Sequence, residues 1–142
     1  MLRLFRTNEI RDVQELDGDW DFQPINGVEG LPACYEYRMP VPGCWEMHPQ
    51  FATYQGKGVY RRTVEISRKG AIRLVFKGVS HTADVFFDGI PAGRHYNAYT
   101  PFAVVIPYVE PGTHEVAVIV DNSFGESSAL HVPNDYYTYG GM

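Results

Sequence analysis

Short runs in which apolar and polar residues alternate recur along this chain, and they constrain its fold more than any other sequence feature. In residues 71–77, the apolar residues Ile72, Leu74 and Phe76 fall at every second position. Successive side chains of a β-strand point to opposite faces, so this period of two indicates a strand with one buried face. The same pattern predicts strands at residues 19–23, 59–66, 102–106 and 115–121.

Turn signals separate these runs. Asp88-Gly89 follows the apolar run at residues 85–87 and predicts a hairpin, because both central residues of a type I′ turn need positive φ. Lys69-Gly70 and Pro111-Gly112 mark two further turns. Strands that recur roughly every 8–15 residues are typical of a β-sandwich or barrel. We see no internal repeat or linker and expect one domain over residues 1–142.

Two parts of the chain remain open or depart from the alternation. Residues 1–17 contain neither glycine nor proline and allow a helix or an extended segment; we expect the extended form. Arg62 falls on the same face as Tyr60, Val64 and Ile66, and so interrupts an otherwise apolar stripe.

Charge and composition exclude several classes of function. The net charge is −5, and a nucleic-acid-binding protein usually carries a basic stripe, so we expect no nucleic-acid partner. No apolar run approaches the ~20 residues that span a bilayer. The first ten residues lack the apolar core of a secretion signal, so we expect a cytoplasmic protein without a membrane partner. Cys34 and Cys44 lack redox-pair spacing, and we expect buried free thiols.

Two segments outside the predicted strands are candidates for function. Residues 46–58 are polar, aromatic and rich in turn formers, and residues 134–141 bring Asp135 together with three tyrosines and two glycines. Aromatic rings stack on the apolar face of a sugar, and a carboxylate accepts hydrogen bonds from its hydroxyls. No histidine pair has zinc-binding spacing, and we expect neither a metal site nor another cofactor. A monovalent or calcium ion bound by aspartate and carbonyl oxygens in the sandwich stays open, with no particular site to name.

A series of motifs also follows a recognisable order along roughly residues 10–142. They are LDGDWDF (16–22), MPVPGCWE (39–46), GVYRRTVEI (58–66), IRLVFKGVSHTADVFFDG (72–89), YTPFAVVI (99–106), PGTHEVAVIVDN (111–122) and NDYYTYGGM (134–142). In this order they resemble the N-terminal domain of glycoside hydrolase family 2, and most of all its β-glucuronidase and β-galactosidase branches. The resemblance implies an all-β jelly-roll sandwich of the galactose-binding-domain type.

The resemblance also implies a division of labour between domains. Family members are retaining glycosidases, whose chemistry needs two carboxylates ~5–5.5 Å apart. In the family both are glutamates on a TIM barrel, which needs about 250 residues and follows two sandwich domains. We therefore expect this chain to be non-catalytic. Its expected partners are the remaining domains of a larger enzyme, which binds a β-glycoside substrate and is often a homo-oligomer in this family.

Substrate-binding residues are implied by the same resemblance. The aspartate at the place of Asp135 hydrogen-bonds hydroxyls of the sugar being cleaved, whereas a turn-capping role is the alternative reading. Tyr136 and Tyr137, like Tyr139, either line this site or pack beneath it. Trp20 and Trp45 are expected to pack in the core or between domains.

Two other functions fit the sequence as well. A free-standing carbohydrate-binding module would need its own exposed aromatic platform, for which residues 46–58 are the candidate. A generic β-sandwich interaction domain is the third reading, because a fold does not fix a function. The glycosidase reading predicts an exposed apolar patch where neighbouring domains dock.

Overall fold

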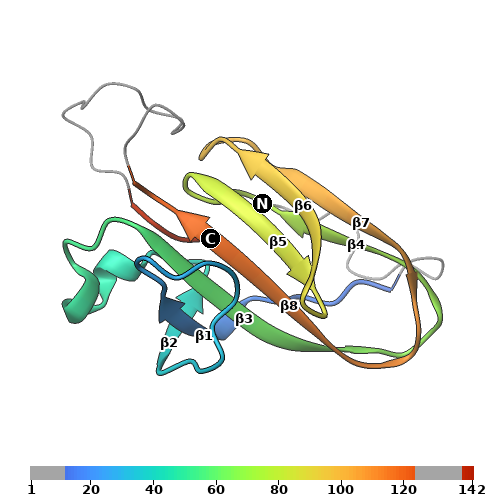
Figure 1. Ribbon diagram of the computed structural model, residues 1–142. Coiled ribbons are helices and arrows are strands. Elements are labelled where there is room, and N and C mark those ends of the chain that lie inside the picture. The colour runs from blue at the N-terminus through green and yellow to red at the C-terminus, as the bar shows by residue number, and fades with distance from the viewer. Residues whose placement is uncertain (1–11, 124–138) are drawn as a thin grey trace.

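The computed structural model describes residues 12–123 and 139–142, and these form a β-sandwich (Figure 1). Its strands are β1 (Gly18–Pro24), β2 (Tyr37–Val41), β3 (Lys57–Ile66), β4 (Gly70–Phe76), β5 (Thr82–Phe87), β6 (Ile90–Tyr96), β7 (Phe102–Val109) and β8 (Gly112–Asp121). Two single-turn 3₁₀ helices, η1 (Trp45–Met47) and η2 (Pro49–Phe51), lie between β2 and β3. The all-β jelly-roll prediction is therefore confirmed.

The two layers are unequal in size. The larger sheet has six antiparallel strands in the order β2-β1-β3-β8-β5-β6, and β4 and β7 pair to form the second layer. The β3–β8 pair at the centre runs from Lys57 opposite Asp121 to Ile66 opposite Gly112. This long pairing places the start of β3 beside the end of β8, at one end of the sandwich.

The core lies between the two layers and is made by the alternating residues that the sequence singles out. Trp20 and Phe22 of β1 are buried there, as are Leu74 of β4 and Val104 of β7. Along the central strand the inward residues are Val116, Val118 and Val120, each fully buried. The predicted period of two is thus confirmed where it was assigned.

Strand β8 differs from a half-buried strand because its outer face is covered as well. Ala117 and Ile119 are buried in a second cluster with Ile25 and Val59, against which Leu31, Tyr35 and Phe86 pack. The Arg61 guanidinium lies over the Tyr35 ring, 3.9 Å from its centroid, and so holds Tyr35 on this face. Arg61 is itself held by an ion pair with Asp21 (2.9 Å). Burial raises the pKa of Tyr35 to about 12, although the charge of Arg61 opposes the shift.

Arg62 faces the core side, and its guanidinium is satisfied by backbone carbonyls. Its guanidinium donates to the carbonyls of Leu16 (2.9 Å) and Asp17 (3.1 Å), and the Trp20 indole N–H also donates to Leu16 (2.8 Å). Residues 12–17 form neither helix nor strand and supply these carbonyls to β3 and β1. The remainder of the N-terminal segment, residues 1–11, lies outside the described residues.

Strand β7 continues past Pro107, where the alternating pattern suggested an end. Proline lacks a backbone donor and is tolerated in sheets at edges and irregularities. Both conditions hold here, because β7 belongs to a two-stranded sheet and the β4–β7 register shifts between Gly70 and Ile72, opposite Val109 and Ile106. The irregularity therefore accommodates the proline.

The β5–β6 hairpin confirms the predicted Asp88-Gly89 turn. Asp88 has φ of 50° and Gly89 has φ of 75°, as a type I′ turn requires. The Asp88 carboxylate ties the turn to β8 by accepting from the Glu115 N–H (2.8 Å) and pairing with His114 Nδ1 (2.7 Å). His114 Nε2 lies 2.7 Å from the Glu110 carbonyl, so both ring nitrogens face acceptors.

This arrangement predicts a pH-dependent contribution to stability. The bonds to Asp88 and Glu110 raise the pKa of His114. Partial burial opposes ionisation of Asp88, but its bonds to His114 and the Glu115 N–H hold its pKa below the ordinary value. The pair therefore stabilises the fold from the lowered pKa of Asp88 up to the raised pKa of His114, and loses this contribution as pH rises through the latter.

We expect His114→Gln to lower the free energy of unfolding most near pH 5–6 and much less near pH 9, where neutral histidine has lost its second donor. Urea unfolding of both chains across this pH range measures the difference. His48→Gln is a suitable control on a histidine outside this hairpin. A difference that is constant with pH would contradict the assignment.

Candidate functional site

The predicted substrate-binding residues Asp135, Tyr136 and Tyr137 lie outside the described residues, so their positions remain predictions. The chain on either side of them is described, and it meets at one end of the sandwich. In Figure 1 the end of β8, the η1–η2 turns and the C-terminal residues lie together there. The described residues on either side of residues 124–138 are therefore brought together at this junction.

On the N-terminal side of residues 124–138, Asn122 follows β8 directly and is fully buried. Asn122 pairs with Gly56 at two points, because the Gly56 N–H donates to Asn122 Oδ1 (2.9 Å) and the Asn122 N–H donates to the Gly56 carbonyl (3.1 Å). The side-chain nitrogen of Asn122, Nδ2, also donates to the Tyr54 carbonyl (3.3 Å). The chain is therefore fixed at its point of departure.

On the C-terminal side of residues 124–138, residues 140–142 lie between two parts of the domain. The Gly140 carbonyl accepts from the Trp45 N–H (2.9 Å), and the Met142 carbonyl accepts from the Gly43 N–H (2.9 Å). On the other side, the Ser80 N–H donates to the Gly141 carbonyl (3.0 Å). The returning chain therefore joins the segment before η1 to the segment between β4 and β5.

Two glycines make this close approach possible. A Cβ on Gly140 would lie 2.0 Å from Cζ2 of Trp45, and a Cβ on Gly141 would lie 2.0 Å from the Gly43 carbonyl oxygen. Trp45 is fully buried, packs against Phe22 with ring centroids 5.6 Å apart, and donates its indole N–H to the Tyr54 carbonyl (3.1 Å). The ring cannot retreat, so only glycine fits at position 140.

Glu46 links the two ends of the segment. Its Oε1 accepts from the Gly140 N–H (2.8 Å) and from Asn122 Nδ2 (3.0 Å), while Oε2 lies 3.1 Å from the same Gly140 nitrogen. Burial raises the pKa of Glu46 above its ordinary value, although the bonds from Gly140 and Asn122 act in the opposite direction. A carboxylate is an acceptor-only group, which matches these donors.

The surroundings of Glu46 are hydrophobic and hold neighbouring groups in their neutral forms. Burial raises the pKa of the Cys44 thiol, and the charge of Glu46 adds to that effect. Burial likewise raises the pKa of Tyr60, whose hydroxyl has no hydrogen-bond partner among the described residues. Both shifts disfavour the ionised, nucleophilic form of these groups.

The cysteine prediction needs a correction. Both thiols are free, but Cys34 is exposed and Cys44 is only half-buried. Cys34 lies in the irregular segment between β1 and β2, which covers the outer face of the larger sheet and presents part of its own residues to solvent. The prediction of a buried thiol was wrong for Cys34, because no other part of the described structure covers the outer side of this loop.

Residues 46–58 do not form an exposed aromatic platform. Phe51 is buried, and it packs against Phe22 and Tyr37. The Tyr54 hydroxyl lies within hydrogen-bond distance of two acceptors for its one hydrogen, Asn26 Oδ1 (2.8 Å) and the Lys57 carbonyl (2.7 Å). The core assignment of Trp20 and Trp45 is confirmed, with 3% and 0% exposure. Tyr139, by contrast, is exposed in this chain.

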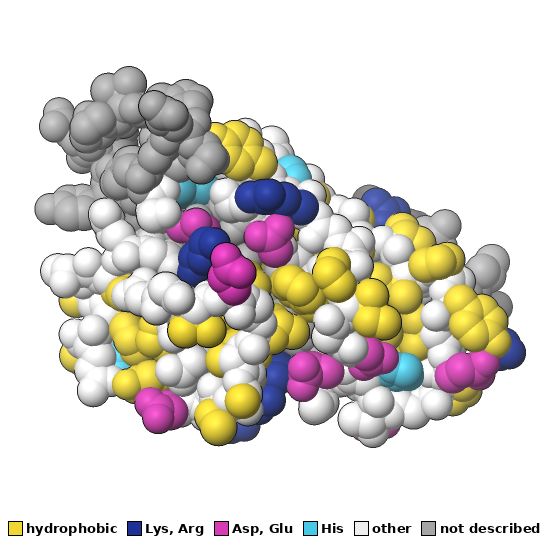
Figure 2. Space-filling view, in the orientation of Figure 1, with side chains coloured by type: hydrophobic (Ala, Val, Ile, Leu, Met, Phe, Trp, Pro, Cys, Tyr) yellow, Lys and Arg dark blue, Asp and Glu magenta, His cyan; other side chains and the backbone are white. Residues whose placement is uncertain are grey.

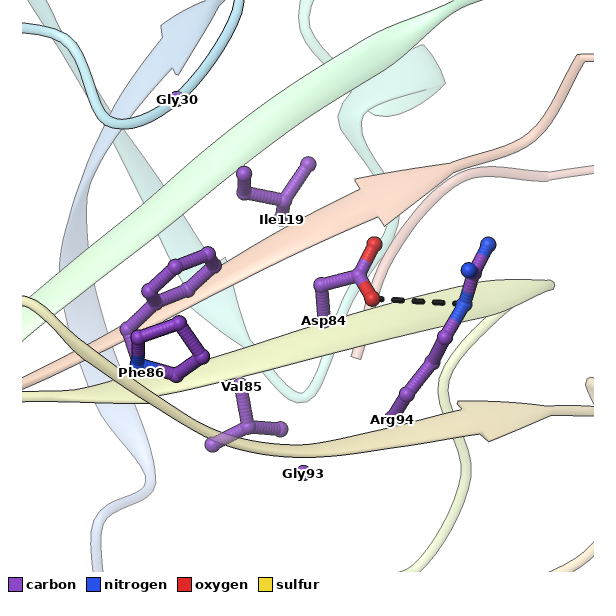
Figure 3. A pocket seen from close by; sticks show the side chains of 8 residues that line it. Gly30, Asp84, Val85, Phe86, Gly93, Arg94 and Ile119 are labelled. Carbon is purple, nitrogen blue, oxygen red and sulfur yellow. Dashed lines mark ion pairs between the residues drawn. The ribbon is translucent and has the colours of Figure 1, made fainter.

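A shallow groove of about 480 Å³ lies on the outer face of the larger sheet, away from Glu46. Its floor includes Phe86 and Ile119, and the Asp84–Arg94 ion pair (3.3 Å) closes one side (Figure 3). Hydrophobic side chains gather on this face, with acidic and basic groups among them (Figure 2). Among the described residues that line it, Phe86 is the sole aromatic one and the Asp84 carboxylate is paired with Arg94, so this lining lacks the paired rings and free acceptors of a sugar site.

Two classes of site are absent from the part of the chain that the structure describes. No group of three or more histidine, cysteine, aspartate or glutamate side chains there is placed to hold a metal ion. Within the same residues, no helix has the length and apolar character needed to cross a membrane.

Glu46 is the residue of this junction that the sequence did not reveal. It appeared only as the last letter of the MPVPGCWE motif and as the start of a polar loop. A single acidic residue beside a buried tryptophan was the available signal, but its partners are 76 and 94 positions away along the chain. Sequence spacing alone does not bring such residues together.

Known proteins resemble this chain in both sequence and structure. A β-galacturonidase from Eisenbergiella tayi, solved with galacturonate bound, is 54% identical, superposes with a TM-score of 0.84, and is matched over 99% of this chain and 24% of its own. A β-glucuronidase of Streptococcus agalactiae is 27% identical over 89% of this chain and 22% of its own length. A β-galactosidase of Thermoanaerobacterium thermosulfurigenes is 34% identical over 63% of this chain and 13% of its own length.

The chain thus spans at most about a quarter of the length of these relatives. Residues 13–142 match the family described as glycosyl hydrolases family 2, sugar binding domain. This match covers both layers of the sandwich and the junction at Glu46. The chain therefore belongs to glycosyl hydrolase family 2, as the sugar binding domain of that family.

Proposed function

We propose that this chain is the non-catalytic N-terminal domain of a retaining β-glycosidase that hydrolyses β-galacturonides. The observation that carries the proposal is 54% identity, over 99% of this chain, to a β-galacturonidase solved with galacturonate bound. The relatives extend far beyond the region matched here, and the proposal places the two catalytic carboxylates in those further domains.

The chemistry of galacturonate accounts for the mixed set of relatives. Galacturonate carries a carboxylate at C6, as glucuronate does, and an axial hydroxyl at C4, as galactose does. A site for this sugar shares requirements with both β-glucuronidases and β-galactosidases, and proteins of both names match this chain. This supports a β-galacturonide as the preferred substrate.

The contribution of this domain is the segment that leaves at Asn122 and returns at Gly140. We propose that Asp135, which lies in this segment, accepts hydrogen bonds from hydroxyls of the sugar at the cleavage site, with Tyr136 and Tyr137 beside it. An ionised carboxylate accepts without donating, which suits neighbouring hydroxyl donors. The buried anchoring of both ends of the segment supports this role, because it gives the segment fixed points of attachment.

The test uses the enzyme that contains this domain and aryl β-galacturonide, β-glucuronide and β-galactoside substrates. We expect the galacturonide to have the highest kcat/KM. We expect Asp135→Asn to lower that value by about 10- to 150-fold, which corresponds to the loss of roughly 1.5–3 kcal/mol for a hydrogen bond to a charged group.

Asp19→Asn is the matched control, since Asp19 is an exposed carboxylate on β1 and takes no part in the junction bonds described above. It is expected to leave kcat/KM unchanged. Full activity of the Asp135→Asn enzyme would refute the assigned role. A preference for another sugar would refute the substrate assignment.

The free-standing carbohydrate-binding module receives less support. The aromatic rings of residues 46–58 that such a module would use pack inward, since Phe51 is buried and Tyr54 packs against it with ring centroids 6.0 Å apart. The predicted docking patch has a counterpart on the outer face of the β4–β7 layer, where Val75 and Val105 are 62% and 60% exposed. We also propose that the parent enzyme is a cytoplasmic homo-oligomer, which cell fractionation and light scattering measure.

A further inference from the structure

The two strands of the smaller layer, β4 and β7, carry apolar residues on both of their faces. Their inner residues, such as Leu74 and Val104, belong to the core. Their outer residues include Val75 and Val105, which are 62% and 60% exposed. A strand with one solvated face alternates apolar and polar residues, whereas a strand covered on both faces is apolar at successive positions. The outer face of this layer therefore has the composition of a covered face.

Two strands of the larger sheet show what each pattern means in this domain. Strand β8 is apolar at every position from Val116 to Val120, and both of its faces are buried. Strand β1 buries one face, and its outward residues are the polar Asp19, Asp21 and Gln23. Strand β7 is apolar at every position from Phe102 to Ile106 and so resembles β8, although its outer face is exposed.

The exposed residues of this outer face are contiguous. In the β4–β7 register, Val75 lies opposite Ala103 and Arg73 lies opposite Val105, and all four are exposed (Figure 1). Directly opposed residues of antiparallel strands have Cβ atoms about 4.5–5.5 Å apart, so the two pairs form one surface. We call these four residues the β4–β7 patch. Three of them are small or β-branched, which makes the patch flat.

The charge of the β4–β7 patch is one-sided. Arg73 is the one charged residue in strands β4 and β7. Among the described residues, no carboxylate lies within ion-pair distance of its guanidinium. A second copy packed by two-fold symmetry would bring the patch against itself and place two Arg73 side chains together without an acid. The charge therefore favours a different surface that carries a carboxylate.

The relatives supply the source of such a surface. The matched region is 24% of the β-galacturonidase and 22% of the Streptococcus β-glucuronidase, so most of each enzyme is further polypeptide. We propose that a further domain of the same enzyme packs on the β4–β7 patch, with apolar side chains against Val75 and Val105 and a carboxylate against Arg73. The inference rests on the proposed function only in that this chain is one domain of a longer enzyme.

Hydroxyl-radical oxidation, followed by mass spectrometry, tests the cover directly in the enzyme that contains this domain. We expect Val75 and Val105 in the native enzyme to react at less than about a fifth of their rates in the unfolded enzyme, because the centre of an interface excludes water. Rates above about half of the unfolded values would match their exposure in this domain alone and would overturn the inference.

Substitutions test the two parts of the contact separately. Val105→Glu places a charge in the apolar part, and Arg73→Glu reverses the charge that meets the carboxylate. Each is expected to lower the midpoint of thermal unfolding of the enzyme by at least about 2–4 °C, since each buries a charge without a partner. Arg73→Lys keeps the positive charge and is expected to retain most of the stability.

Val28→Glu is the matched control. Val28 is 55% exposed, close to the exposure of the two patch valines, but it lies in the segment between β1 and β2. Its replacement is expected to leave the unfolding midpoint unchanged. An unchanged midpoint for Val105→Glu would overturn the docking of a further domain, and an unchanged midpoint for Arg73→Glu would overturn the carboxylate.

Other occupants of the patch give different results. If removal of residues 1–11 exposes the two valines to oxidation, this chain covers its own face. If the valines become reactive when an oligomer dissociates on dilution, as followed by light scattering, a second copy covers them. Either result would overturn the inference, whereas protection that persists in the dissociated enzyme supports it.

The inference and the proposed function fail separately, because none of these measurements uses a substrate. A preference for another sugar, or full activity of the Asp135→Asn enzyme, would refute the proposed function and leave the cover of the patch unaffected. Free oxidation of Val75 and Val105 would overturn the inference and leave the substrate assignment to its own test.

Discussion

Replacement of Trp45 by alanine is expected to lower the free energy of unfolding of this chain by about 3–5 kcal/mol, the usual cost of truncating a buried tryptophan. Trp45 is fully buried and packs against both Phe22 and Tyr54, with ring centroids 5.6 Å apart in each case. Its removal also takes away the indole donor to the Tyr54 carbonyl. Since domains of this size are stable by about 5–15 kcal/mol, the loss is a large share of the total.

Denaturant unfolding of the two chains measures this difference. Tyr99→Ala is a suitable control, because Tyr99 is 85% exposed and its truncation is expected to change stability by less than about 0.5 kcal/mol. If the free energy of unfolding of the Trp45→Ala chain lay within about 1 kcal/mol of that of the unchanged chain, the surrounding residues would have collapsed into the vacated space. That result would contradict the tight packing inferred for Trp45.

Replacement of Gly140 by alanine is expected to detach the returning segment from the sandwich. The added Cβ would overlap the Trp45 ring at 2.0 Å, and overfilling a packed site typically costs about 1–3 kcal/mol. The Gly43 and Trp45 amides, which donate to Met142 and Gly140, are expected to lose their protection from hydrogen exchange. Unfolding and exchange measurements on the same chain test both effects.

The cause can be checked in a second background. In a Trp45→Ala chain the space for the new methyl group exists, so Gly140→Ala is expected to cost far less there, and the two changes will not add. Tyr139→Ala serves as the control, since its side chain is exposed although it neighbours Gly140. Equal costs of Gly140→Ala in both backgrounds would contradict a steric origin.

Features that depend on neighbouring residues were predictable from the sequence. The period of two located the strands, and Asp88-Gly89 located a hairpin, because side-chain alternation and positive φ are set by local backbone geometry. The series of motifs indicated the family, which the match over residues 13–142 confirms. The same reasoning failed for Cys34, whose exposure depends on which layer lies above its loop.

Some residues of the candidate site were suggested by the sequence, and others were found only in the structure. The sequence drew attention to Asp135, Tyr136 and Tyr137 by their types and order, and their roles remain predictions. It gave no indication that Glu46 bonds to both ends of the segment containing them. That contact depends on the antiparallel pairing of β3 with β8, which brings Lys57 opposite Asp121 and so places η1 and η2 near Asn122.

The sequence by itself determined the strand positions, the hairpin turn and the family, since each follows from short patterns or from their order. Only the tertiary structure decided that β8 is covered on both faces and that Glu46 meets Asn122 and Gly140. The physical reason is that these contacts join residues 76 and 94 positions apart, and their formation depends on how the two layers close.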